Sequence, residues 1–257
     1  MNRIQRLFSK KEKDICNIYF TAGFPNLNDT EKIILTLDKA GADMVEIGMP
    51  YSDPLADGET IQESGSIALK NGMNLPLLFE QIASARQKTD MPMIMMGYFN
   101  QVMQYGEEAF FKKCQEVGID GLILPDLPAA IYEADYQALM KKYDLNNIFL
   151  ITPQTPKERM VYLDSLSSGF VYMVADASVT GKQKDISNNQ IAYFESMQKM
   201  NFKNPKLIGF GISDHQSFST ACNYSNGAII GSAFIRALKK SENIEETIFD
   251  FIGMVKG

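Results

Sequence analysis

Stretches with helical periodicity that end in glycine recur along the chain, and a short apolar run follows each of them. The first stretch ends at Gly41, and its apolar positions share one helix face: Ile33, Ile34, Leu37 and Ala40. Asn28 with Glu31 three residues later has the form of a capping box, so we expect this helix to begin there. The same order, with Gly118 and Gly227, precedes the apolar runs 120–124 and 228–230.

The apolar runs that predict strands number eight: 17–21, 43–48, 93–96, 120–124, 147–151, 170–174, 206–208 and 228–230. They lack the in-out alternation of a half-solvated sheet, which favours parallel strands covered on both faces. The pattern therefore predicts an α/β fold, a (β/α)8 TIM barrel with extra short helices. A doubly wound open sheet is the alternative, because periodicity alone cannot close the ring. The 257 residues, 45% of them hydrophobic and without a linker, predict a single domain over 1–257.

Composition excludes several classes of protein. A net charge of -6 with scattered basic residues argues against a nucleic-acid partner. No apolar run approaches the roughly 18 residues of a membrane span, and the amino terminus does not read as a signal peptide. We therefore expect a soluble, cytoplasmic protein. Cys16, Cys114 and Cys222 are far apart and predict neither disulfides nor a zinc site, so we interpret them as buried apolar residues. The one histidine, His215, is interpreted as a surface residue in a first helical turn.

Glu46 is a carboxylate inside an apolar strand. Alternation places Val45 and Ile47 on one face and Met44, Glu46 and Gly48 on the other. Both faces look buried, and desolvation of an unpaired carboxylate costs several kcal/mol or forces it to take up a proton. A raised pKa at Glu46 predicts a general acid or base. A structural glutamate bonded to a hydroxyl or a backbone amide is the other interpretation.

In such a barrel, active sites lie at the carboxyl ends of the strands. Asp53 and Asp57 follow the second predicted strand. The glycine-containing turns 209–213 and 231–233 each open a helix and suggest a phosphate site, with ordinary tight turns as the alternative. The polar segment 176–185 suits a lid that excludes water, or else a disordered connection. Four aromatic residues at the mouth imply a flat apolar ligand, unless they only fill the core: Tyr19, Tyr98, Tyr172 and Phe210.

Residues 46–58, which read Glu-Ile-Gly-Met-Pro-Tyr-Ser-Asp-Pro-Leu-Ala-Asp-Gly, closely resemble the signature of the tryptophan synthase alpha subunit family. Agreement continues in order along essentially the whole chain, in segments 21–23, 60–62, 96–98 with Asn100, 125–128, 179–181, 209–213 and 231–233. The resemblance implies a lyase that cleaves indole-3-glycerol phosphate by a retro-aldol reaction into indole and glyceraldehyde 3-phosphate.

The resemblance also assigns roles by position. It implies that Glu46 is the general acid and base, that Asp57 holds the indole N–H and steadies the cationic intermediate, and that Tyr172 assists. The substrate-binding positions that it implies are Tyr19, Met96, Tyr98 and Phe210 around the indole, Thr180 and Gly181 in the lid, and Gly211, Gly231 and Ser232 at the phosphate. No metal and no cofactor are implied in this chain. Pyridoxal phosphate is expected only in a beta subunit, which the loop at Asp53 and Pro54 would contact in an α2β2 assembly.

Three departures from the family pattern leave Glu46 and Asp57 in place. Residues 175–178 read Ala-Asp-Ala-Ser where many relatives have Ser-Arg-x-Gly, Phe24 replaces a common aspartate, and Glu59 replaces a usual proline. They bear on lid closure and on coupling to the beta chain.

Other functions remain as alternatives. One is a stand-alone lyase that releases free indole, and another is a barrel that binds a phosphorylated ligand and activates a partner without cleaving the ligand. Two aldolase classes are disfavoured. A Schiff-base aldolase would need a lysine at a strand end, and a metal-dependent aldolase would need several convergent histidines, whereas this chain has one.

Overall fold

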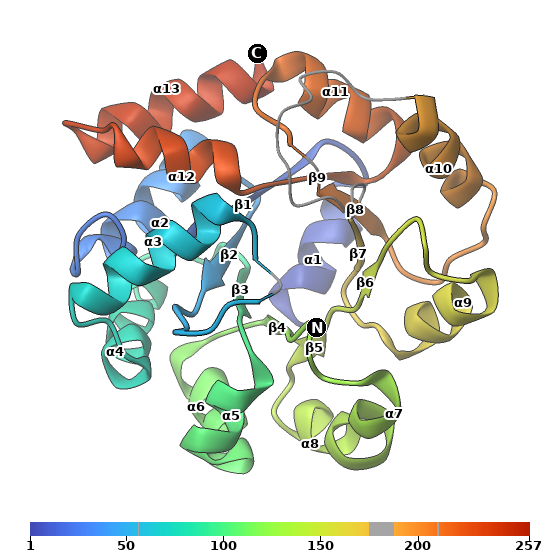
Figure 1. The fold of residues 1–257 in the computed structure, drawn as a ribbon, viewed down its shortest axis with the longest axis horizontal. Coiled ribbons are helices and arrows are strands. Elements are labelled where there is room, and N and C mark those ends of the chain that lie inside the picture. Colours follow the sequence, from blue (N-terminus) through green and yellow to red (C-terminus); the bar gives the residue numbers. More distant parts are fainter. Residues whose placement is uncertain (56, 175–187, 210) are drawn as a thin grey trace.

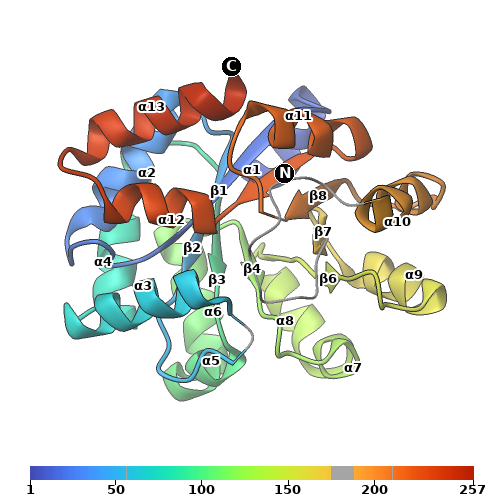
Figure 2. The ribbon, with the colours of Figure 1, turned by 45° about the horizontal axis from the view of Figure 1, so that its top comes forward.

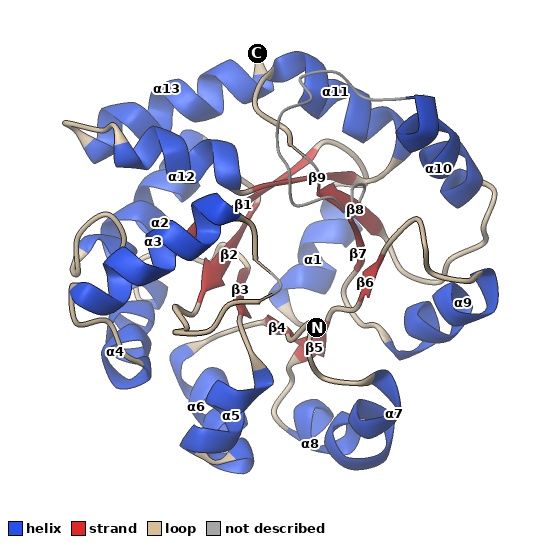
Figure 3. Cartoon of the chain, in the orientation of Figure 1, coloured by secondary structure: helices blue, strands red, loops and turns tan. Residues whose placement is uncertain are grey.

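The strands of this protein form a ring of parallel strands surrounded by helices (Figures 1 and 3). The computed structural model describes residues 1–55, 57–174, 188–209 and 211–257. Its strands are β1 (Ile15–Thr21), β2 (Met44–Gly48), β3 (Met93–Met96), β4 (Gly121–Ile123), β5 (Asn146–Asn147), β6 (Leu150–Ile151), β7 (Val171–Val174), β8 (Lys206–Gly209) and β9 (Gly227–Ile230). They pair in the order β5-β4-β3-β2-β1-β9-β8-β7-β6, and each pair is parallel.

The two ends of that order belong to one stretch of chain, because only Ile148 and Phe149 separate β5 from β6. The Ile148 amide donates to the carbonyl of Leu122 in β4 at 3.0 Å, and the Tyr172 amide of β7 donates to the Phe149 carbonyl at 3.0 Å. The stretch therefore joins β4 to β7 and closes the ring. β5 and β6 together are the strand predicted over 147–151, so the eight-stranded barrel is confirmed and the open sheet is wrong.

Most helices connect consecutive strands and cover the outside of the ring, whereas α1 (Arg3–Lys10) precedes β1 and lies across one end of the ring (Figure 1). The other helices are α2 (Asp29–Ala40), α3 (Glu59–Lys70), α4 (Leu75–Arg86), α5 (Phe99–Tyr105), α6 (Glu107–Val117), α7 (Ala129–Ile131), the π-helical turn η1 (Tyr132–Tyr136), α8 (Gln137–Lys142), α9 (Lys157–Leu166), α10 (Asn188–Gln198), α11 (His215–Tyr224), α12 (Ser232–Lys239) and α13 (Ile244–Lys256). Gly41 and Gly118 end α2 and α6 at φ of 90° and 81°, a left-handed conformation that favours glycine. These predicted helix ends are confirmed.

The start of α2 differs from the prediction in its capping. The helix begins at Asp29 after Asn28, as expected, but the Asn28 side chain makes no capping hydrogen bond. Its backbone has ψ of 11°, outside the extended conformation from which an N-cap side chain reaches back to the first turn. Asp29 accepts a hydrogen bond from the Asn26 amide at 3.1 Å instead. The predicted capping box is therefore wrong.

The side chains of each strand divide between two apolar layers. Met44 packs with Ile15, Ile94 and Leu207 inside the ring, whereas Val45 and Ile47 belong to the larger core between strands and helices. The predicted division of the second strand into two buried faces is confirmed. Glu46 therefore points into the ring, on the same face as Met44.

α1 covers the amino-terminal end of the ring. Ile4 is fully buried in the interior cluster, and the Asn2 side chain donates to the carbonyl of Asp120, directly before β4, at 3.0 Å. The carboxyl ends of the strands lie at the opposite end, where active sites of this fold are found.

Helices from the two chain ends pack together on one side of the barrel. α13 contacts α2, and α12 contacts both α13 and α3 (Figure 2). The three cysteines are buried as expected, and His215 is exposed at the first position of α11. Among the helices that the structure describes, none is long and apolar enough to cross a membrane.

Candidate active site

Glu46 lies inside the barrel with none of its surface exposed. Its Oε1 accepts a hydrogen bond of 2.6 Å from Asn17 Nδ2 on the neighbouring strand, and within the described part of the chain its Oε2 has no hydrogen-bond partner. Burial raises the pKa of Glu46 to about 8, and the Asn17 hydrogen bond only partly opposes this. The carboxyl is therefore mainly protonated at neutral pH and close to its titration range.

Asp57 lies in the loop between β2 and α3 and is partly buried. Its Oδ2 accepts a long hydrogen bond of 3.4 Å from the Tyr98 hydroxyl, which comes from the loop after β3. Burial raises the pKa of Asp57, and the Tyr98 hydrogen bond acts in the opposite direction. Tyr98 stacks on Tyr51 at 4.8 Å between ring centroids, and the Tyr51 hydroxyl accepts from Asn100 at 3.0 Å. Loops after two strands thus meet around Asp57.

Tyr19 and Tyr172 lie inside the ring near Glu46. Tyr19 is the Cα partner of Glu46 across β1 and β2. Burial raises the pKa of Tyr172, and the nearby charges of Glu46 and Asp57 raise it further; burial and the charge of Asp57 do the same for Tyr19. Both phenols are therefore neutral donors near the two carboxyl groups.

Two glycines make room for these rings. A Cβ on Gly48 would overlap the Tyr19 hydroxyl, and a Cβ on Gly209 would overlap the ring of Tyr172. Since both glycines end strands, the chain keeps the carboxyl end of the barrel open for two large side chains that come from opposite parts of the ring.

The structure describes some of the other predicted site residues but not all of them. Met96 ends β3 as the Cα partner of Gly48 and is partly buried, and Gly231 lies beside the Tyr19 ring. Gly231 and Ser232 open α12, and Gly211 is exposed two residues after β8. Thr180, Gly181 and Phe210 lie outside the described residues, as does the segment 175–178.

The arrangement can move protons. A neutral, buried carboxylic acid in its titration range can give a proton and take one back, and a second carboxylate nearby can hold a cation. Donor positions at the start of α12 can hold an anion.

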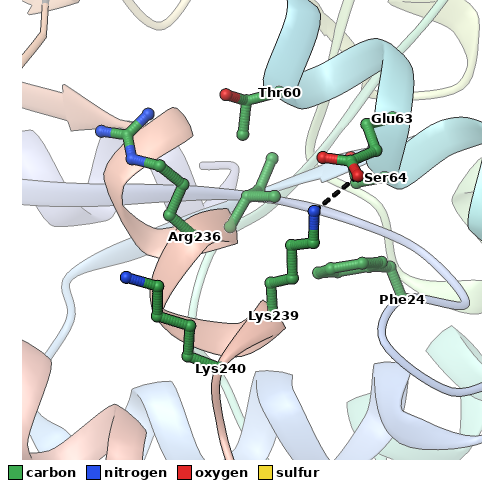
Figure 4. A pocket seen from close by; sticks show the side chains of 8 residues that line it. Phe24, Thr60, Glu63, Ser64, Arg236, Lys239 and Lys240 are labelled. Atoms are coloured by element: carbon green, nitrogen blue, oxygen red, sulfur yellow. Dashed lines mark hydrogen bonds and ion pairs between the residues drawn. The ribbon is translucent and has the colours of Figure 1, made fainter.

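A separate cavity of about 350 Å³ lies between α3 and α12 (Figure 4). Its lining contains Phe24, Thr60, Glu63, Ser64, Ile235, Arg236, Lys239 and Lys240, and Lys239 pairs with Glu63. None of the acid-bearing or tyrosine residues of the barrel interior lines it. The family departure Phe24 is thus a buried wall of this cavity, while Glu59 is the exposed first residue of α3.

Reasoning from the sequence did not identify Asn17 as a functional residue. A signal was present, because Asn17 is a polar residue at an inward position of an apolar strand, in step with Tyr19. What it bonds to could not be foreseen, because its partner Glu46 is 29 positions away.

Comparisons with known proteins agree along the full length. The model of the family described as tryptophan synthase alpha chain matches residues 5–254. The chain is 53% identical over 256 residues to the tryptophan synthase alpha chain of Flavobacterium johnsoniae, covering all of both chains. The alpha subunit structure from Legionella pneumophila is similar with a TM-score of 0.89 and 28% identity, covering 100% of this chain and 97% of that one. A chain of the Pyrococcus furiosus tryptophan synthase complex is similar with a TM-score of 0.85 and 29% identity, over 95% and 98% of the two chains.

Proposed function

This chain belongs to the tryptophan synthase alpha chain family and is a lyase that cleaves indole-3-glycerol phosphate, and on that premise we propose that Glu46 and Asp57 carry the reaction. The observation that carries the proposal is the state of Glu46. It is fully buried inside the ring, its pKa is raised to about 8, and one of its oxygens bonds to nothing in the described residues. A purely structural glutamate would have both oxygens occupied.

The retro-aldol reaction needs two proton transfers, one to a carbon atom and one from a hydroxyl group. The bond between indole carbon 3 and the glycerol chain breaks, carbon 3 receives a proton, and the hydroxyl on the departing carbon loses one as it becomes the aldehyde. Glu46, protonated at neutral pH, gives its proton to carbon 3 and then takes the hydroxyl proton. It therefore returns to its starting state without an external acid or base.

Asp57 steadies the intermediate. Protonation at carbon 3 places positive charge on the indole nitrogen, and a carboxylate beside the N–H stabilises that charge. The Tyr98 hydrogen bond favours the anionic form of Asp57 that this role requires. Tyr172, near both carboxyl groups, assists as a neutral hydroxyl.

The remaining positions bind substrate. Tyr19, Met96 and Tyr98 surround the indole together with Phe210. The phosphate is held at Gly211, Gly231 and Ser232, where the amides that open α12 favour an anion. Thr180 and Gly181 belong to a lid, an assignment that rests on the family pattern.

We also propose that the partner is a tryptophan synthase beta chain in an α2β2 assembly, that pyridoxal phosphate binds to that beta chain, and that the single domain 1–257 acts in the cytoplasm. The similar Pyrococcus furiosus chain comes from a tryptophan synthase complex. In this chain Leu55, in the loop with Asp53 and Pro54, is 93% exposed, so its side chain is available to contact a protein partner.

The direct test replaces Glu46 by glutamine. Glu46→Gln keeps the shape but cannot exchange a proton, so we expect indole release to fall at least about 1,000-fold while indole-3-glycerol phosphate still binds in calorimetry. Glu63→Gln is the matched control, because Glu63 is exposed on α3 and should retain full turnover. Near-normal turnover by Glu46→Gln would refute the assignment.

A second experiment separates the alpha half of a synthase from a stand-alone lyase. Indole release at saturating substrate is measured with and without the beta chain, and we expect the beta chain to raise the rate. Equal rates would favour the stand-alone lyase.

A further inference from the structure

Asn17 is a polar side chain in the apolar interior of the barrel. It is fully buried on β1, and its Cα partners are Met44 and Ile229 of the interior cluster. A buried amide costs free energy unless its donor and acceptor both find partners. An apolar residue would fill the same space without that cost, so Asn17 requires an explanation.

The amide has one partner, which is the proposed acid and base. Asn17 Nδ2 donates to Glu46 Oε1 at 2.6 Å, the one hydrogen bond that the described residues give to this carboxyl. Two buried atoms are left over, Asn17 Oδ1 and Glu46 Oε2, and neither has a partner among the described residues. Each of the two side chains thus uses one polar atom in their mutual hydrogen bond and has one polar atom without a partner among the described residues.

The other groups facing Glu46 do not fix its carboxyl. They are Tyr19 from β1 and Tyr172 from β7, and the Cα partner on β3 is the apolar Ile94. The charge of Asp57, from the loop after β2, raises the pKa of both tyrosines but does not act on the pKa of Glu46. No lysine or arginine in the described ranges shifts the pKa of Glu46. Burial therefore favours the neutral acid, and the Asn17 donor is the group that favours the anion.

An amide can serve both states of a carboxyl group. Toward the carboxylate it presents its N–H donor, and after half a turn of the amide it presents its carbonyl oxygen to the O–H of the acid. The unused Oδ1 is the acceptor that the protonated carboxyl needs. A hydrophobic replacement at this position lacks both the donor and the acceptor, and an ionised carboxylate lacks the donor.

We propose that Asn17 is a positioning residue that holds one oxygen of Glu46 in both protonation states, by donating to the carboxylate and accepting from the acid, and so leaves Oε2 for the substrate. This rests on the proposed role of Glu46. Asn17 itself does not touch the substrate, so its loss lowers the rate of the proton transfers rather than the affinity for indole-3-glycerol phosphate.

Two substitutions test the proposal in the chain assembled with its beta partner. Asn17→Leu keeps the branched shape and removes donor and acceptor. Asn17→Asp keeps the shape and places a second carboxyl group beside Glu46. For Asn17→Leu we expect kcat to fall at least about 10-fold with KM within about 3-fold. Asn17→Asp is also expected to lose activity. Because it keeps a polar side chain at this position, it still tests the proposal if Asn17→Leu fails to fold.

The titration of Glu46 is the readout that a merely structural role would not move. The carbonyl band of its protonated form is followed by infrared spectroscopy against pH and is identified by its absence in Glu46→Gln. We expect the midpoint to rise by about one pH unit in Asn17→Leu, because the anion loses its donor. In Asn17→Asp we expect two coupled steps, because neighbouring carboxyl groups share one proton.

Asn146→Leu is the matched control. Asn146 is also a buried strand asparagine, and it donates to the Asp120 carbonyl at 3.1 Å near the amino end of the barrel. This variant should lose stability and keep both kcat and the Glu46 titration. An unchanged titration and rate in folded Asn17→Leu or Asn17→Asp, or an equal shift in Asn146→Leu, would overturn the proposal. If Glu46→Gln is inactive in that case, the role of Glu46 still stands; if Glu46→Gln is active, the proposed function itself fails.

Discussion

The hydroxyl of Tyr19 occupies the space that a side chain on Gly48 would fill. The two residues lie on neighbouring strands, and Gly48 follows Glu46 by two positions on the same inward face. A glycine at the end of β2 therefore determines where the Tyr19 ring can lie, directly beside the proposed acid and base.

Gly48→Ala should displace the Tyr19 ring, because the added Cβ overlaps the phenol oxygen. We expect a loss of about 1–3 kcal/mol in the free energy of unfolding and a fall in kcat/KM of at least about 10-fold. Urea unfolding and a steady-state indole assay measure the two effects. Gly253→Ala in α13 is the control, since its added Cβ would meet nothing within 4 Å beyond its chain neighbours and the backbone of its own helix, and it should be neutral or slightly stabilising. Equal behaviour of the two variants would contradict the relationship.

The stability of the protein should depend on pH through Glu46. Its pKa rises from 4.5 to about 8 on folding, so between these values the folded chain holds a proton that the unfolded chain has released. The contribution of this group to the free energy of unfolding therefore falls as pH rises through that window. Glu46→Gln lacks this titration. The free energy of unfolding of the variant, relative to that of the unmodified chain, should therefore increase from pH 5 to pH 8.5 by an amount on the order of several kcal/mol. Urea unfolding at the two pH values measures this, and a difference that does not change with pH would refute it.

Tyr98→Phe should raise the pKa of Asp57, because it removes the hydroxyl donor that favours the anion. Since Asp57 acts as the anion, activity on the acidic side should be lost at a higher pH than in the unmodified chain. A pH profile of kcat/KM from pH 5 to 9 measures the shift, which we expect to be about half a pH unit to one unit. Tyr51→Phe is the control, because Tyr51 stacks on the same ring but does not bond to Asp57. A shift of the same size in Tyr51→Phe would assign the effect to packing instead.

Asp120 anchors the amino-terminal end of the barrel. Its buried carboxylate pairs with Arg3 at 3.1 Å and with Arg86 at 3.2 Å, and accepts from the Met93 amide at 3.0 Å. Asp120→Ala removes this partner from Arg86, whose side chain is only 12% exposed. We expect the free energy of unfolding, measured by chemical denaturation, to fall by about 3 kcal/mol with kcat unchanged.

Asp90→Ala is the matched comparison for Asp120. Asp90 also pairs with Arg3, but its side chain is 69% exposed. We therefore expect Asp90→Ala to lower the free energy of unfolding by less than about 1 kcal/mol. A similar loss in both variants would show that burial does not decide the strength of this network.

Leu55→Asp should weaken binding of the beta chain without destabilising the barrel. Leu55 is 93% exposed and so contributes little to the core. We expect the dissociation constant measured by calorimetry to rise at least about 10-fold, with no change in the urea midpoint. Val161→Asp on α9, where Val161 is 57% exposed, is the control and should leave the affinity unchanged. Unaltered affinity in Leu55→Asp would place the partner surface elsewhere.

The sequence by itself determined the order of strands and helices, the glycine ends of α2 and α6, and the placement of Glu46 on the same buried strand face as Met44 and Gly48. These features follow from local rules: apolar runs, a period of two along a strand, and the left-handed conformation that glycine accepts. The same rules failed at Asn28, because the side-chain cap depends on a backbone angle that the capping-box pattern does not specify.

Only the tertiary structure decided which side chains meet. The hydrogen bonds from Asn17 to Glu46 and from Tyr98 to Asp57 join residues 29 and 41 positions apart, and the chain closes its ring through the interrupted strand at Ile148 and Phe149. Sequence periodicity reports the face on which a residue lies, but not its neighbour across the barrel. That neighbour is set by the register between strands and by the space left by Gly48 and Gly209, which exist only once the ring has closed.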